Sequence, residues 1–190
     1  MKVLLTAINS KFIHSNLAVR YLKAFTEDMD YISKIREFSI NDRDEKVLEE
    51  IIKEKPDIVA FSTYIWNIEM VKRLSNLIKI VNSHIKILYG GPEVSYDSSN
   101  ILNELNVDYL IEGEGEKTYR EFVEYTLGER DIKSIRGLYY KEGNKVIGNG
   151  NRPLMNMNEL VFPYKMDENL DNKIVYYEAS RGCPFNCKYC

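Results

Sequence analysis

The chain has 190 residues, of which 44% are hydrophobic and 29% are charged, and its formal net charge is -3. This composition is typical of a folded protein with room for one full domain and an appendage. The slightly acidic balance provides no basic face for nucleic acid. The apolar runs are far shorter than the roughly 20 residues of a membrane-spanning helix, and the N-terminus lacks a signal peptide pattern. We therefore expect a cytoplasmic protein that binds neither nucleic acid nor membrane.

The first 130 residues alternate short apolar runs with amphipathic stretches. The apolar runs predict strands at residues 2–8, 31–40, 57–63, 85–91 and 107–113. Apolar residues three or four positions apart predict helices at residues 15–28, 42–55, 67–82, 95–106 and 115–128. Ser15 is the expected N-cap of the first helix, and Pro56 ends the second.

Five strands, each followed by a helix, predict an α/β fold with a doubly wound, five-stranded parallel sheet of flavodoxin-like (Rossmann-like) order. We place this domain at residues 1–130. Residues 131–172 are predicted to form a β-hairpin about a Gly-Asn turn and then a linker that contains two prolines. Residues 173–190 are predicted to add one more strand, "KIVYYEAS", which leads directly into a cysteine cluster.

Ligands of open parallel sheets bind beyond the carboxyl ends of the strands, so the loops there are candidate site elements. Gly90 and Gly91 end the fourth strand, where backbone without side chains can approach a ligand closely. The loop after the third strand carries two hydroxyls and two aromatic rings, on Ser62, Thr63, Tyr64 and Trp66. Each feature alone also fits a turn, a helix cap or a cover over the core. Together, on one edge of the sheet, they favour a ligand site.

The loop "EGEGEKT" after the fifth strand is a near match to the dinucleotide-binding pattern G-x-G-x-x-G. That pattern belongs after the first strand, and its third glycine is here Thr118. Glu112, Glu114 and Glu116 would also repel a pyrophosphate. We therefore disfavour NAD, FAD and FMN, and expect a large, flat ligand of low net negative charge. His14, in the first loop, is interpreted as a loop residue beside the helix cap rather than as a metal ligand.

Cys183, Cys187 and Cys190 are the cysteines of the chain and have the spacing C-x3-C-x2-C. Zinc usually takes four ligands, whereas a [4Fe–4S] cluster held by three thiolates leaves one iron open for a substrate or cofactor. An odd, clustered set also fits a reducing compartment better than a disulfide framework. The spacing favours an iron–sulfur cluster over the alternative of a zinc site in a nucleotide-binding domain.

The motif "CPFNCKYC" resembles the cluster motif of the radical S-adenosylmethionine (radical SAM) superfamily. The resemblance implies that Cys183, Cys187 and Cys190 hold a [4Fe–4S] cluster whose open iron chelates S-adenosylmethionine. It also implies that Tyr189 lies near the adenine, and that the cluster cleaves S-adenosylmethionine reductively to a 5′-deoxyadenosyl radical.

The preceding residues resemble the cobalamin-binding (B12-binding) domain found before the barrel in B12-dependent radical SAM enzymes. The resemblance is carried by "TAINSKFIHSNLAVRYL", "VAFSTYIWN", "LYGGPEVS" and "DYLIEGEGEKTYREFVE". It implies that strand-end residues line a corrin or its nucleotide tail, namely Thr6, Ser62, Thr63, Gly90, Gly91, Gly113 and Gly115. We expect the loops there to add further cofactor-binding residues, namely Asn9, Tyr64, Trp66, Glu93 and Glu114.

Many B12 domains ligate cobalt through the histidine of D-x-H-x-x-G, a motif that is missing here, because His14 is followed by "SNLA". We therefore expect cobalamin to bind without a histidine from that motif. We interpret the chain as the N-terminal part of a B12-dependent radical SAM enzyme, with methyl transfer as one candidate reaction. Its partner would be the C-terminal barrel of the same protein, and this part alone is expected to be inactive. The alternative is a flavodoxin-like binding or interaction module that no longer binds cobalamin.

Overall fold

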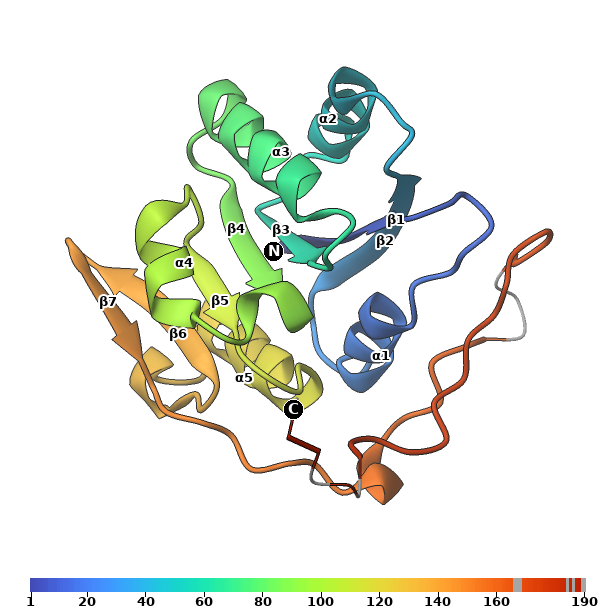
Figure 1. Ribbon diagram of the computed structural model, residues 1–190. Coiled ribbons are helices and arrows are strands. Elements are labelled where there is room, and N and C mark those ends of the chain that lie inside the picture. The colour runs from blue at the N-terminus through green and yellow to red at the C-terminus, as the bar shows by residue number, and fades with distance from the viewer. Residues whose placement is uncertain (166–168, 184, 186, 189–190) are drawn as a thin grey trace.

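A mostly parallel β-sheet forms the centre of the computed structural model, which describes residues 1–165, 169–183, 185, 187 and 188 (Figure 1). Five parallel strands lie in the order β2-β1-β3-β4-β5, which is the predicted flavodoxin-like order. Their bounds are β1 (Lys2–Asn9), β2 (Ile32–Ser39), β3 (Ile58–Ser62), β4 (Lys86–Gly90) and β5 (Tyr109–Ile111). Strand β3 is buried along its whole length, as expected for a central strand covered on both faces.

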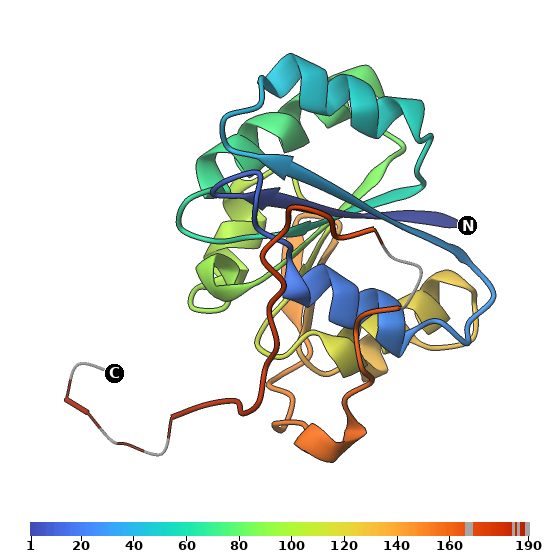
Figure 2. The same cartoon turned by 90° about the vertical axis from the view of Figure 1, so that its right-hand side faces the viewer.

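Helices cover both faces of the sheet, and each follows a strand. They are α1 (Leu17–Phe25), α2 (Asp44–Lys53), α3 (Ile68–Val81), α4 (Ser98–Glu104) and α5 (Glu116–Thr126). Helices α1 and α5 lie on one face, and α2, α3 and α4 lie on the other (Figures 1 and 2). The N-cap of α1 is Asn16, whose side chain accepts a hydrogen bond from the Val19 amide, and not the predicted Ser15. In the part of the chain that is described, no helix is long and apolar enough to cross a membrane.

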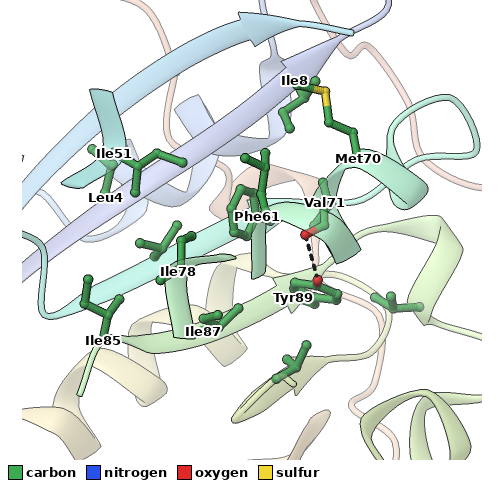
Figure 3. Packing of buried hydrophobic residues seen from close by; sticks show 14 of the residues in the cluster. Leu4, Ile8, Ile51, Phe61, Met70, Val71, Ile78, Ile85, Ile87 and Tyr89 are labelled. Atoms are coloured by element: carbon green, nitrogen blue, oxygen red, sulfur yellow. Dashed lines mark hydrogen bonds between the residues drawn. The ribbon is translucent and has the colours of Figure 1, made fainter. Parts of the chain in front are cut away.

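Two hydrophobic cores result, one on each face of the sheet. The core beneath α2 and α3 is shown in Figure 3 and contains Phe61 and Tyr89, whose rings meet edge to face. The Tyr89 hydroxyl is completely buried, lies 2.6 Å from the Ser75 hydroxyl and donates to the Val71 carbonyl. Burial raises the pKa of Tyr89 well above its ordinary value. The paired hydroxyl allows a tyrosine to fill the core without leaving a polar atom unsatisfied.

The predicted hairpin is present and extends the same sheet. Strands β6 (Leu138–Glu142) and β7 (Lys145–Gly148) are antiparallel, and β6 pairs with β5 to give a seven-stranded sheet. The sequence predicted the hairpin but not its place beside β5. Ile135 and Leu138 are completely buried in the core beneath α1 and α5. The hairpin therefore covers the edge of β5, which would otherwise expose unpaired backbone groups.

The described residues at 160–165 and 169–181 run as an extended strap along the α1 side of the domain (Figure 2). Contrary to the prediction, residues 173–180 form no strand. Ile174 makes one isolated bridge to His14, with the Ser15 amide donating to the Ile174 carbonyl at 3.2 Å. A strand needs a hydrogen-bonded neighbour along its length, and among the described residues only this single position has one.

Candidate ligand site

An apolar cavity of about 110 Å³ lies on the α1–α5 face of the sheet, where the strand order reverses between β1 and β3. Four strands and two helices contribute to its wall. The sheet contributes Leu5, Ala60, Ser62, Leu88 and Ile111, and helix α1 contributes Ala18, Val19 and Leu22. Crevices at such switch points are the usual ligand sites of doubly wound sheets.

Small residues keep this cavity open. Gly90, Gly91, Gly113 and Gly115 line it together with Ala18, so that no long side chain enters from the loops after β4 and β5. Gly91 has a φ of +118°, and a Cβ atom there would collide with the backbone of Thr63. Only glycine fits this position without strain. The pair of adjacent glycines predicted from the sequence therefore shapes the cavity.

Ser62 provides a polar group in the cavity wall. Its side chain is 7% exposed, and no described residue hydrogen-bonds its Oγ atom. A buried hydroxyl without a partner is uncommon and costly. Thr63 is different, because its hydroxyl donates to the Gly90 carbonyl at 2.9 Å. Of the two hydroxyls expected to reach a ligand, only that of Ser62 is available to one.

Tyr64 and Trp66 form an aromatic pair at the same edge of the sheet. Their rings are stacked with centroids 4.5 Å apart and planes 5° apart. Tyr64 lines the cavity, whereas Trp66 is 46% exposed and its Nε1 atom donates to the Ile8 carbonyl at 3.3 Å. Burial raises the pKa of Tyr64 above its ordinary value. Thus the ring of Tyr64 lines the cavity, and the ring of Trp66 stacks on it without lining the cavity.

Four other predicted residues, Thr6, Asn9, Glu93 and Glu114, do not line the cavity. Thr6 is completely buried in the middle of β1, and Glu93 lies in the short turn η1 (Pro92–Val94). The Asn9 amide donates to the His14 carbonyl at 2.9 Å and to Glu37 at 3.2 Å. Asn9 therefore organises the loop after β1 instead of facing the cavity.

The acidic loop after β5 is largely neutralised by one arginine. Arg181 pairs with Glu116 through two nitrogen atoms, and its Nη1 atom lies 3.7 Å from Glu114. Burial alone would lower the pKa of Arg181. Hydrogen bonds to Glu116 and Glu178 raise that pKa by more, so it lies above its ordinary value. The sequence predicted that these carboxylates would repel an anionic ligand. In the structure, Glu114 and Glu116 both lie beside the positively charged Arg181.

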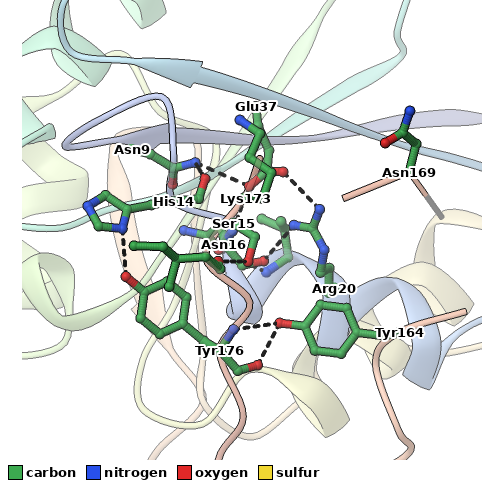
Figure 4. Close-up of polar contacts among 12 residues, drawn as sticks. Asn9, His14, Ser15, Asn16, Arg20, Glu37, Tyr164, Asn169, Lys173 and Tyr176 are labelled. Atoms are coloured by element: carbon green, nitrogen blue, oxygen red, sulfur yellow. Dashed lines mark hydrogen bonds and ion pairs between the residues drawn. The ribbon is translucent and has the colours of Figure 1, made fainter. Parts of the chain in front are cut away.

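The strap contacts the loop after β1 through a polar network (Figure 4). The Tyr176 hydroxyl lies 2.6 Å from Nδ1 of His14, and the Tyr164 hydroxyl donates to the Tyr176 carbonyl at 2.6 Å. His14 is thus a loop residue that hydrogen-bonds the strap, and the sequence also placed it in this loop. No group of three potential metal ligands occurs among the described residues.

The predicted cluster ligands are only partly described. Cys183 and Cys187 are exposed free cysteines, and Cys190 and Tyr189 lie outside the described residues. Sequence reasoning missed Leu22 and Arg181. The first belongs to the apolar stripe of α1, which predicted only packing against the core, and the second lies 65 residues from its partner Glu116.

Comparison with known proteins identifies relatives of this chain. Residues 3–123 match the family model described as "B12 binding domain". An uncharacterized methyltransferase of Pyrococcus horikoshii is 32% identical over 74% of this chain and 32% of its own length. The cobalamin-dependent radical SAM methyltransferase TokK of Streptomyces tokunonensis is 27% identical over 72% of this chain and 22% of its own length. The chain thus spans a third or less of these relatives.

Solved structures show the same fold. The cobalamin-dependent S-adenosylmethionine radical enzyme OxsB, with aqua-cobalamin and S-adenosylmethionine bound, superposes on 85% of this chain with a TM-score of 0.68 and 18% identity, over 24% of the OxsB chain. The radical S-adenosylmethionine methyltransferase TsrM of Kitasatospora setae, with cobalamin and a [4Fe-4S] cluster, superposes on 78% with a TM-score of 0.65 and 18% identity, over 30% of the TsrM chain.

Proposed function

The chain belongs to the B12-binding domain family, and from this premise we propose that it holds the cobalamin of a radical SAM methyltransferase. The observation that carries the proposal is the apolar cavity at the switch point, with Ser62 as an unpartnered hydroxyl in its wall. A site that is apolar apart from a few convergent polar groups is typical of cofactor pockets.

The described residues fit one part of cobalamin better than the whole. A cavity of about 110 Å³ has no room for a macrocycle, since an engineered cavity of about 150 Å³ holds benzene. Of the parts of cobalamin, the flat benzimidazole is the one that can insert an edge into a narrow apolar cavity, with the rest of the ring system at its mouth. We assign the cavity to the benzimidazole of the nucleotide tail, with Ser62 as its hydrogen-bonding partner and Tyr64 as an aromatic wall. The corrin would then contact the glycine loops around Gly91 and Gly113.

The cysteines support the second half of the proposal. Cys183 and Cys187, with Cys190, have the spacing of a three-thiolate iron–sulfur site. When bound, such a cluster supplies the electron that cleaves S-adenosylmethionine, and cobalamin supplies a carrier for a methyl group. The protein residues bind, orient and shield these groups. The remaining machinery would belong to a C-terminal barrel. The match covers 32% and 22% of the two relatives' lengths, which leaves room in them for such a domain.

Calorimetric titration tests the assignment of the cavity. Cobalamin has the benzimidazole tail and cobinamide lacks it, so the parent chain is expected to bind cobalamin more tightly. Ala18→Phe fills the cavity from α1 and is expected to reduce the cobalamin affinity at least tenfold, while leaving cobinamide binding unchanged. Ala24→Phe, on the same helix but outside the cavity lining, is the matched control. Equal affinities for cobalamin and cobinamide in the parent would overturn the assignment.

Anaerobic reconstitution tests the cluster. With iron and sulfide, the parent chain is expected to take up about four of each per chain, as a [4Fe–4S] cluster requires. Cys187→Ala removes one proposed ligand and is expected to abolish uptake without changing the folded α/β domain. Zinc uptake with no iron retained would instead favour a zinc site.

A further inference from the structure

Arg181 lies where three separate parts of the chain meet. Its guanidinium contacts Glu116 at the first turn of α5, Glu114 in the loop after β5, and Glu178 in the strap at 2.8 Å. The same group lies over the ring of Tyr21, with the Cζ atom 5.5 Å from the ring centroid. Arg181 therefore connects the strap to both helices that cover the cavity, α1 and α5.

The contact between Arg181 and Glu116 is largely buried. The Glu116 side chain is 6% exposed and that of Arg181 is 17% exposed, so neither charge is well solvated. Removing one member of a buried ion pair is strongly unfavourable, because the other charge is left without a partner. The paired arrangement, with two nitrogen atoms on one carboxylate, also fixes the orientation of the guanidinium plane.

The position of this contact relates the cavity to the cysteines. Glu116 is one of the residues that line the cavity. Cys183 follows Arg181 by two residues, and two residues extend over at most about 7 Å. Fixing Arg181 on Glu116 therefore limits where the first cysteine of the motif can lie relative to the cavity.

We propose that Arg181 is a positioning residue that fixes the start of the cysteine loop against the wall of the cavity. This inference rests on the proposed function, in which the cavity holds cobalamin and the cysteines hold the cluster. Because Glu116 belongs both to the cavity wall and to the contact with Arg181, ligand binding and the Arg181–Glu116 contact stabilise each other. Such coupling is reciprocal: loss of the contact weakens the ligand, and the ligand strengthens the contact.

A distance measurement between two spin labels tests the positioning without any cofactor. One label is placed on Cys183 in a chain with Cys187→Ser and Cys190→Ser, and the other on Tyr96→Cys, a site that is 96% exposed. We expect a narrow distance distribution in this background and a distribution at least twice as broad after Arg181→Gln or Glu116→Gln. Arg181→Lys, which keeps the charge but not the two-nitrogen contact, is expected to give an intermediate width.

Arg130→Gln is the matched control, because it removes an arginine–glutamate pair with Glu124 that does not reach the cavity. It is expected to leave the distribution narrow. The double variant Arg181→Gln, Glu116→Gln should be no broader than Arg181→Gln alone, because both changes remove the same contact. A distribution that stays narrow after Arg181→Gln overturns the proposal.

A titration with hydroxocobalamin then tests the coupling. We expect Arg181→Gln to weaken binding about five- to tenfold, and Arg130→Gln to leave it unchanged. Unchanged affinity in Arg181→Gln overturns the coupling. If the parent chain binds no cobalamin while the label distances still broaden, the proposed function fails and the positioning role of Arg181 stands.

Discussion

At the scale of single residues, Gly91 is placed where no other residue fits. It lines the cavity, its φ is +118°, and an added Cβ atom would lie 2.9 Å from the Thr63 amide nitrogen. Gly128 also has a positive φ, of +83°, but has open space around an added Cβ. Both positions therefore carry a backbone cost for an L-residue. At Gly91 that cost is larger, because φ +118° with ψ 176° is a region that essentially only glycine adopts, and the collision adds to it.

Substitution of these glycines compares a position with a collision to one without. We expect Gly91→Ala to lower the free energy of unfolding by about 1–3 kcal/mol more than Gly128→Ala, because overpacking adds to backbone strain. Urea unfolding followed by circular dichroism measures the difference. Equal losses in the two variants would mean that Thr63 moves aside, and that the cavity wall is less rigid than described.

Glu54 makes the stability depend on pH. Hydrogen bonds from Lys34 at 2.5 Å and Lys2 at 3.0 Å, together with Arg36, hold the pKa of Glu54 at about 2, below its ordinary 4.5. A carboxylate with a lowered pKa in the folded state contributes stability above its unfolded pKa. That contribution is lost as the pH falls from about 4.5 towards 2.

Glu54→Gln is therefore expected to be less stable than the parent at neutral pH, and the difference should shrink as the pH falls below about 4.5. Urea midpoints measured from pH 7 down to pH 3 give this comparison. Glu49→Gln removes an exposed pair with Lys53 and serves as control, with a difference close to zero at every pH. A gap between Glu54→Gln and parent that is independent of pH would show that the charges around Glu54 do not act as described.

Residue chemistry was only partly predictable from the sequence. The glycine pair alone also fits a turn, and it was identified because other candidate residues were expected at the same edge of the sheet. The different roles of Ser62 and Thr63 were not predictable, because alternate residues of a strand point to opposite faces and the end of β3 sets which hydroxyl faces the cavity. Arg181 was missed because a contact across 65 residues leaves no local pattern.

At the scale of elements, the hairpin completes the sheet. Ile135 and Leu138 are completely buried and Tyr140 is 4% exposed, so the strands β6 and β7 belong to the core beneath α1 and α5. The sequence predicted a domain boundary at residue 130, since the strand–helix alternation ends there. Alternation shows the order of the elements, but it does not show that the hairpin extends the edge of β5.

Truncation tests where the stable domain ends. A chain that stops after residue 150 retains the hairpin, and we expect it to fold. A chain that stops after residue 130 loses three buried side chains, and we expect at least about 3 kcal/mol less stability together with aggregation at the uncovered strand β5. Equal urea midpoints for the two chains would instead support the boundary predicted from the sequence.

The strap adds few side chains to the two cores, because Val161, Phe162 and Ile174 stay exposed, and its middle should open separately from the domain. The Tyr164 hydroxyl donates to the Tyr176 carbonyl and accepts from the Tyr176 amide at 3.2 Å. We expect Tyr164→Phe to speed amide hydrogen exchange at residues 174–176 without changing the unfolding midpoint, because local opening is separate from global unfolding. Tyr177→Phe, at a ring that is 71% exposed, is the control. Exchange that is unchanged in Tyr164→Phe would contradict this role.

At the scale of the whole molecule, the sequence predicted the fold well, because periodic apolar patterns and right-handed crossovers leave few alternatives for five strand–helix units. The sheet order β2-β1-β3-β4-β5 follows. The predicted strand at residues 173–180 is not formed. Its apolar residues show that the segment can form a strand, but not that another strand lies beside it. The family match over residues 3–123 and the cavity at the switch point together support the proposal of a cobalamin site.

The visible spectrum of the chain after incubation with hydroxocobalamin and gel filtration tests the central claim most directly. The account predicts that corrin absorbance elutes with the parent chain at close to one equivalent, and that it is lost in Ala18→Phe but kept in Ala24→Phe. A parent chain that is folded by circular dichroism and elutes without corrin would contradict the account, and would support a binding or interaction module that has lost its cofactor.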